Sequence, residues 1–136
     1  MTEQSLLLIK PDAVKKNHVG HIITIMEQRG FTLKNIKVLQ FDRKRAAEFY
    51  MMHAGKDFYE RLLDFMCSGT TVALLLERID AVAKLRKLVG DADPNKRAPD
   101  TIRAMFADGV TENAVHASDS TLSAKREIAL IFKGAH

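Results

Sequence analysis

The residues around His116 have the types and spacing that covalent group transfer needs. His116 precedes three small polar residues, Ser118, Asp119 and Ser120, which can cap a helix, and Glu127 lies further along the chain. A neutral imidazole, with a reference pKa of about 6.5, is a nucleophile near neutral pH when an acceptor fixes the ring and one nitrogen stays open. The alternative is a buried structural histidine beside a local helix cap, and the spacing alone favours that alternative.

Three basic residues occupy places from which they could bind an anion. Lys10 ends an apolar run and precedes Pro11, which suits the start of a helix and would aim the ammonium group at a ligand. Arg86 and Arg103 flank the polar segment 90–100, and a guanidinium matches the geometry of phosphate oxygens. Taken singly, a solvated lysine and surface ion pairs are the commoner interpretations.

The familiar phosphate and metal motifs are missing from the sequence. None of the seven glycines forms GxGxxG or GxxxxGK[ST], and there is no HExxH. His18 and His21 are three residues apart but have no third ligand, so we interpret them as surface residues rather than a metal site. Tyr50 and Phe58 are typical of core aromatics, although Phe58 could stack on a base at the rim of a cleft.

Strands and helices alternate along the chain in a way that predicts an α+β fold. Apolar runs predict strands over 5–9, 31–41, 70–76 and 128–132. Helices are expected from Pro11 to near Gly30, after a cap at Asp42, and over 58–66, 80–89 and 101–106, with a last one capped by residues 118–120. The order favours a ferredoxin-like α/β sandwich, a four-stranded antiparallel sheet covered by helices.

Composition and charge narrow the class of protein. The 136 residues predict a single domain, 1–136, and a hydrophobic fraction of 46% is enough for a packed core. The net charge of +4 suits an anionic ligand without selecting one. One cysteine, Cys67, excludes an internal disulfide and fits a reducing compartment. With no apolar run near the ~20 residues of a membrane span and no signal-peptide pattern at the start, we expect a cytoplasmic protein with no membrane contact.

Together these pieces resemble the nucleoside diphosphate kinase family from about Leu6 to Phe132. The matching motifs are IKPDAV from Ile9, VGHII around Gly20, FY..H ending at His53, the SG pair before a buried strand, AV…R, TIR, and NAVHASDS…SA..EI. The last motif is the most specific, and order, spacing and length all agree.

The resemblance implies an enzyme that moves the γ-phosphate of a nucleoside triphosphate, typically ATP, to a nucleoside diphosphate. The route is ping-pong through a phosphohistidine, for which His116 is the matching residue. The residues that match the family's other catalytic positions are Lys10, Tyr50, Asn113, Ser118 and Glu127. Those that match nucleotide contacts are Lys10, Phe58, Arg86, Ala92, Arg103, Val110 and Asn113. Mg²⁺ is expected to arrive on the nucleotide phosphates, with no metal site of the protein's own, and a dimer, tetramer or hexamer is expected.

Four positions depart from the family pattern. Ala92 replaces a threonine whose hydroxyl contacts phosphate, a loss of roughly 0.5–1.5 kcal/mol. Asp100 and Ala117 stand where glycines are usual, which predicts local rearrangement if either glycine had positive φ. Thr70 replaces a proline. The departures leave open a relative that kept the fold but lost turnover.

A nucleic-acid-binding module is the alternative from another class, and it could also be a secondary activity. It draws on the net charge and on a run of exposed basic residues expected at Lys34, Lys37, Arg43, Lys44 and Arg45. A solvated basic face gives the same pattern. A steep salt dependence of binding to DNA or RNA is the observation that would favour the module.

Overall fold

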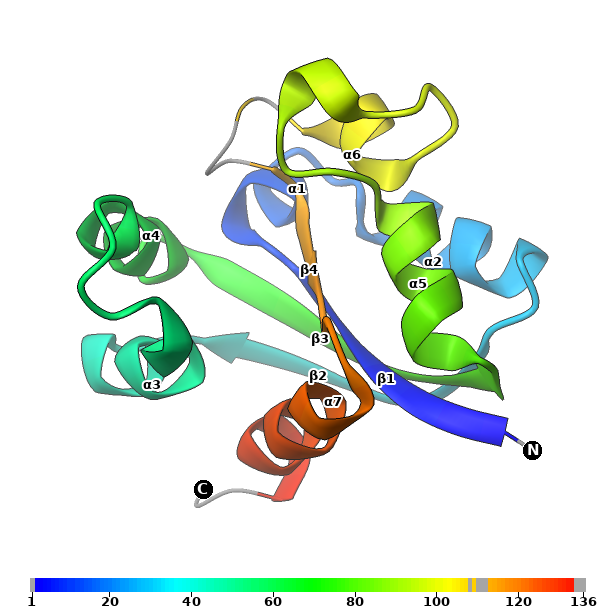
Figure 1. Cartoon of the computed structure of the whole chain (residues 1–136), viewed down its shortest axis with the longest axis horizontal. Coiled ribbons are helices and arrows are strands. Elements are labelled where there is room, and N and C mark those ends of the chain that lie inside the picture. The colour runs from blue at the N-terminus through cyan, green and yellow to red at the C-terminus, as the bar shows by residue number, and fades with distance from the viewer. Residues whose placement is uncertain (1, 108, 110–112, 134–136) are drawn as a thin grey trace.

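The computed structural model describes residues 2–107, 109 and 113–133, and its centre is a four-stranded antiparallel sheet (Figure 1). The strands are β1 (Thr2–Ile9), β2 (Thr32–Gln40), β3 (Thr70–Ile79) and β4 (Val115–Ala117). They lie in the order β2-β3-β1-β4, with every neighbouring pair antiparallel. This arrangement confirms the expected α+β sandwich.

Helices cover both faces of the sheet. On one face lie α1 (Pro11–Lys15), α2 (Val19–Gln28) and α5 (Ala81–Val89). On the other lie α3 (Arg43–Phe49), α4 (Tyr59–Met66) and α7 (Thr121–Ile128). The short α6 (Ile102–Phe106) follows the segment after α5 (Figure 1).

The central strands are apolar on both sides because both sides are covered. In β1, Leu7 and Ile9 join the core under α2 and α5, while Leu6 and Leu8 join the core under α3 and α7. All four side chains are fully buried. A strand buried on both faces appears in the sequence as a continuous apolar run rather than an alternation, which is why β1 and β3 could be predicted.

Side-chain caps begin three helices where the sequence indicates them. Asp42 accepts from the backbone N–H of Arg45, and Ser120 accepts from the N–H of Ser123. Thr101 likewise caps α6. Each cap satisfies a donor that the first turn of a helix leaves unpaired.

The prediction of a final strand over 128–132 was wrong. Ile128 ends α7, and Ala129–Lys133 continues as a π-helical turn. Ile128 and Ile131 are buried three residues apart, which is a helical period, and a short apolar run alone cannot separate helix from strand. The fourth strand is instead the three-residue β4, which carries His116 and was too short to be recognised.

Two further details differ from the expected elements. The helical segment after Lys10 is divided into α1 and α2 by Asn17, whose φ is +63°. The polar segment 90–100 contains a short 3₁₀ turn, Pro94–Lys96, and a second 3₁₀ turn spans Met51–His53. Within the described ranges, no helix is long and apolar enough to cross a membrane.

Candidate active site

Strand β4 places His116 against two aromatic rings. His116 is paired with Leu8 of β1, so its side chain points to the sheet face that α3 and α7 cover. The centroid of the His116 ring lies 5.1 Å from that of Phe49 and 5.7 Å from that of Tyr50, both in edge contacts. The ring is therefore fixed by packing on the side of α3.

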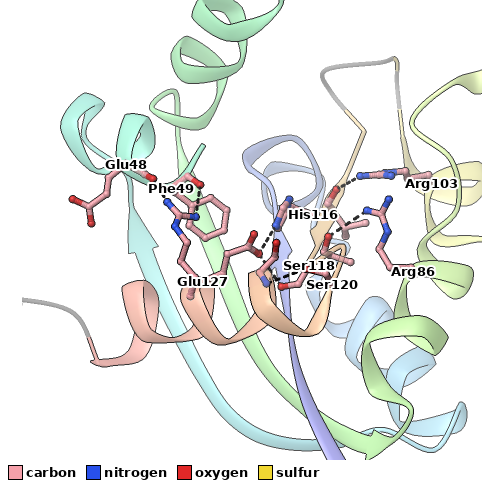
Figure 2. A network of polar contacts seen from close by, with 12 residues as sticks. Glu48, Phe49, Arg86, Arg103, His116, Ser118, Ser120 and Glu127 are labelled. Carbon is pink, nitrogen blue, oxygen red and sulfur yellow. Dashed lines mark hydrogen bonds and ion pairs between the residues drawn. The ribbon is translucent and has the colours of Figure 1, made fainter. Parts of the chain in front are cut away.

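Helix α7 supplies the acceptor that orients the imidazole. The Nε2 atom of His116 lies 2.8 Å from Oε1 of Glu127, and Ser118 Oγ donates to the same oxygen at 2.8 Å (Figure 2). A carboxylate only accepts hydrogen bonds, so this geometry assigns the ring proton to Nε2. The Nδ1 atom then carries the lone pair, and within the part of the chain that the structure describes no hydrogen bond is made to it.

The surroundings of His116 keep the ring neutral. Burial lowers the pKa of His116 below its ordinary value of 6.5, and the nearby Lys10 and Arg103 act in the same direction, whereas Glu127 opposes them. Burial is the largest of these influences. At neutral pH the imidazole is thus uncharged, with a single ring proton, beside a buried carboxylate.

A cavity of about 820 Å³ opens in front of this ring. Lys10 at the end of β1 points its ammonium at Asn113, with 3.0 Å between Nζ and Oδ1. Arg86, on α5, donates to the carbonyl of Ala117 at 3.3 Å, and Arg103, on α6, donates to the carbonyl of Val115 (Figure 2). Arg103 also donates to the carbonyl of Gly90. Three cations from three elements therefore face the same space as His116.

Two buried polar groups at the cavity have no hydrogen-bond partner among the described residues. They are the hydroxyl of Tyr50 and Nε of Arg103. Burial raises the pKa of Tyr50 well above its usual value, so the hydroxyl remains a donor, and burial lowers the pKa of Arg103 to about 10, so the guanidinium stays charged at neutral pH. Burying a donor without a hydrogen-bond partner costs free energy, and both groups suit an anionic ligand that accepts hydrogen bonds from them.

The opposite end of the cavity is apolar and aromatic. Phe58 is 44% exposed there, and its ring lies 5.2 Å from that of His53. Met52 and Leu62 complete this end. One cavity thus joins a cationic end beside His116 to an aromatic slot, an arrangement that suits the two halves of a nucleotide.

Comparison with known proteins agrees with this geometry. A model of the family described as nucleoside diphosphate kinase matches residues 3–136. The chain belongs to the nucleoside diphosphate kinase family. It is 52% identical over 132 residues to the nucleoside diphosphate kinase of Wolinella succinogenes, covering 97% of this chain and 96% of the relative. It is 43% identical over 133 residues to that of Methanocaldococcus jannaschii, covering 98% and 95%.

Solved structures of the family have the same fold. The Aquifex aeolicus nucleoside diphosphate kinase superposes with a TM-score of 0.94 at 41% identity, covering 98% of this chain and 97% of that one. The Halobacterium salinarum enzyme, solved in complex with CDP, gives a TM-score of 0.93 at 34% identity, covering 97% and 88%. Membership confirms the expected enzyme class, a kinase whose family reaction is ping-pong phosphate transfer through a phosphohistidine.

The residues that the family resemblance assigned to catalysis or to nucleotide contact meet in one place. All of those described line the cavity except Ser118, which lies behind Glu127 and bonds to it. Val110 lies outside the described residues. Other lining residues had no sequence signal of their own: Met52, Leu62, Lys87, Lys96 and Ala98. Of these, Lys96 and Ala98 belong to the polar segment 90–100.

The departures from the family pattern leave the backbone of the site unstrained. Asp100 and Ala117 are not among the described non-glycine residues with positive φ, so neither replacement forces a left-handed conformation. Ala92 lines the cavity without a hydroxyl. Thr70 begins β3 in regular pairing with Gln40. The predicted rearrangement at Asp100 and Ala117 is therefore not required.

The basic surface is partly occupied by internal contacts. Arg43 pairs with Glu60 and Asp64, and the ammonium of Lys37 donates to the carbonyl of Ile131 at 3.1 Å. Charges engaged in this way contribute less to binding a polyanion. This surface gives the nucleic-acid alternative no specific support.

Proposed function

We propose that His116 is the phosphate carrier of this nucleoside diphosphate kinase. One observation supports this assignment above the others. The proton of the imidazole is held on Nε2 by Glu127, so the lone pair on Nδ1 is the ring's nucleophilic site, in a cavity lined by Lys10, Arg86 and Arg103. A positioned neutral histidine among cations is what phosphoryl transfer requires of a protein.

The first half-reaction then proceeds by in-line displacement. The Nδ1 lone pair of His116 forms a bond to the γ-phosphorus, the bond from phosphorus to the β–γ bridging oxygen breaks, and the nucleoside diphosphate leaves with that electron pair. The ring becomes cationic and keeps its Nε2 proton, and the Glu127 carboxylate balances the new charge. In the second half-reaction a terminal oxygen of another nucleoside diphosphate attacks the phosphorus, the N–P bond breaks, and the ring returns to neutral.

The remaining residues bind and orient the nucleotide. Arg86, Arg103 and Lys10 offset the phosphate charge, and the Tyr50 hydroxyl and Nε of Arg103, which have no partner among the described residues, donate to phosphate oxygens. Asn113, the partner of Lys10, fixes that ammonium and contacts the ribose end. Phe58 stacks on the base, with Val110 assigned to the other face of the slot by motif alone. Stacking accepts any base, which explains broad specificity. Ala92 adds backbone and a methyl group to the wall.

A divalent cation, which kinases of this kind generally need, is proposed to be Mg²⁺ bound to the nucleotide. Within residues 2–107, 109 and 113–133 no group of three or more acidic, histidine or cysteine side chains could hold a metal. The separate carboxylates of Asp91 and Asp119 line the cavity and would help to hold a cation that the phosphates bring. When bound, Mg²⁺ would neutralise charge on the phosphates.

We further propose that the whole chain, 1–136, acts as one cytoplasmic domain in a homo-oligomer. Strand β2 lies at the edge of the sheet, and its Ile36 and Val38 side chains are 46% and 67% exposed. An apolar edge strand is a natural surface for a second copy of the chain. The cytoplasm supplies the nucleoside di- and triphosphates, and the free thiol of Cys67 suits its reducing conditions.

The assignment is tested by phosphate exchange between ATP and a deoxynucleoside diphosphate. His116→Ala should abolish exchange while its thermal unfolding and its affinity for MgADP remain close to those of the wild type. His21→Ala is the matched control, because His21 is exposed and does not line the cavity. Wild-type turnover in His116→Ala would exclude His116 as the carrier.

A further inference from the structure

The loop between α5 and α6 forms one wall of the nucleotide cavity. Asp91 and Ala92 line the cavity near its start, and Lys96 and Ala98 line it further along. Apart from the 3₁₀ turn Pro94–Lys96, this loop has no regular structure. Its shape must therefore be held by contacts outside any ladder of backbone hydrogen bonds.

Arg97 provides three such contacts from a single side chain. Its Nε donates to the carbonyl of Asp91, and its Nη2 donates to the carbonyls of Ala92 and Gly109, each at 2.8 Å. The planar guanidinium is rigid and has five N–H donors, so one arginine can fix several carbonyls in a set geometry. The three carbonyls come from two segments of the chain, the loop itself and the connection from α6 to β4.

Arg97 itself does not line the cavity, although both of its neighbours, Lys96 and Ala98, do. Its guanidinium instead binds the backbone carbonyls of Asp91, Ala92 and Gly109. The connection that it reaches at Gly109 leads on to Asn113, which holds Lys10 at the cationic end. Arg97 thus joins the loop that lines the cavity to the connection between α6 and β4.

We propose that Arg97 is a positioning residue that clasps the loop 90–100 against the connection at Gly109 and so preforms the nucleotide cavity. This inference rests on the proposed function, because it assigns to Arg97 an effect on nucleotide affinity. A preformed wall saves the ligand the cost of ordering the loop on binding. Arg97 touches neither the reacting atoms nor His116, so its effect falls on affinity and not on the chemical step.

A second way for Arg97 to act is through its charge alone. Its positive charge is near enough to Arg103 to contribute to the lowered pKa of that guanidinium. Arg97→Lys keeps the charge, but its single ammonium nitrogen cannot take the places of both Nε and Nη2, which bind the three carbonyls. Arg97→Met keeps much of the length of the side chain and loses both charge and donors. Arg29→Met is the matched control, because Arg29 is exposed at the end of α2 and away from the cavity.

The experiment measures the Kd of MgADP by calorimetry, KM and kcat for phosphate exchange, and hydrogen exchange of the amides over 91–95. For Arg97→Met we expect Kd and KM to rise about tenfold and kcat at saturation to stay within about twofold. Amide exchange over 91–95 should become faster in the same variant. Arg97→Lys should resemble Arg97→Met, and Arg29→Met should resemble the wild type.

Three outcomes would overturn the proposal that Arg97 holds the loop. The first is an unchanged Kd in Arg97→Met, and the second is full retention of affinity in Arg97→Lys, which would leave only the charge. The third is wild-type hydrogen exchange over 91–95 in Arg97→Met. If the wild type itself failed to bind MgADP, the proposed function would fall, whereas the hydrogen-exchange comparison would still decide whether Arg97 holds the loop.

Discussion

Removing the charge of Glu127 should slow the chemical step while sparing nucleotide binding. Glu127 is 2% exposed and accepts hydrogen bonds from His116 and Ser118, both at 2.8 Å. Glu127→Gln keeps the shape and an acceptor oxygen for Nε2, but it removes the negative charge that balances the ring once His116 bears the phosphate. The variant therefore tests the charge itself.

The size of the effect follows from the bond that is weakened. A hydrogen bond to a charged group contributes about 1.5–3 kcal/mol. When such an interaction is lost only from the transition state, each loss of about 1.36 kcal/mol lowers the rate about tenfold. We expect kcat to fall roughly 10- to 150-fold, with the Kd of MgADP within about twofold of the wild type. Because Glu127 raises the pKa of His116, Glu127→Gln should also lower that pKa further.

The assay is steady-state exchange from MgATP to a deoxynucleoside diphosphate at saturation, with ring protonation followed separately by NMR. Glu48→Gln is the matched control, because Glu48 is an exposed carboxylate on α3 that does not line the cavity. A kcat within twofold of the wild type, or a rise in the pKa of His116, would refute the role assigned to Glu127.

Three further results are expected. Because burial lowers the pKa of His116 below 6.5, an NMR titration should give a midpoint below that pH, and a midpoint above 6.5 would contradict this. The contribution of His116 to the free energy of unfolding should be constant above pH 6.5 and fall as the pH drops below it. Gly90→Ala should lower the unfolding temperature, because φ is +90° and a Cβ would lie 2.6 Å from Thr101, and an unchanged temperature would contradict the close packing. Phe58→Ala should raise KM, because about 1–3 kcal/mol of stacking free energy is lost, and it should leave kcat unchanged. Substitution of the exposed Leu122 by Ala should change neither constant, and a fall in kcat alone would argue against stacking.

The sequence predicted the sheet well wherever burial leaves a strong pattern. β1 and β3 are apolar on both faces, so their runs indicate strands directly. β4 has only three residues, and its middle one is His116, so no period could appear. The run from Ile128 is equally apolar but helical, because only the packing of Ile128 and Ile131 against the sheet decides its conformation.

The candidate site was predicted by motif and not by physical pattern. His116, Lys10 and Glu127 are far apart in the sequence, and only the sheet and α7 bring them together. Neither the tautomer set by Glu127 nor the contacts of Arg97 has a sequence signal, because each depends on where a backbone carbonyl or carboxylate lies in the folded chain. The spacing of residues along the sequence cannot predict such contacts between distant segments of the chain.

The most direct test of the central claim identifies which ring nitrogen carries the phosphate. Purified protein is incubated with MgATP labelled at the γ-phosphate without acceptor, digested under alkaline conditions that preserve phosphohistidine, and analysed for its phosphohistidine isomer. Because Glu127 holds the proton on Nε2, we predict a single isomer phosphorylated on Nδ1, absent from His116→Ala and discharged by UDP in the wild type. Phosphate on Nε2, or label that persists in His116→Ala, would contradict the proposed mechanism.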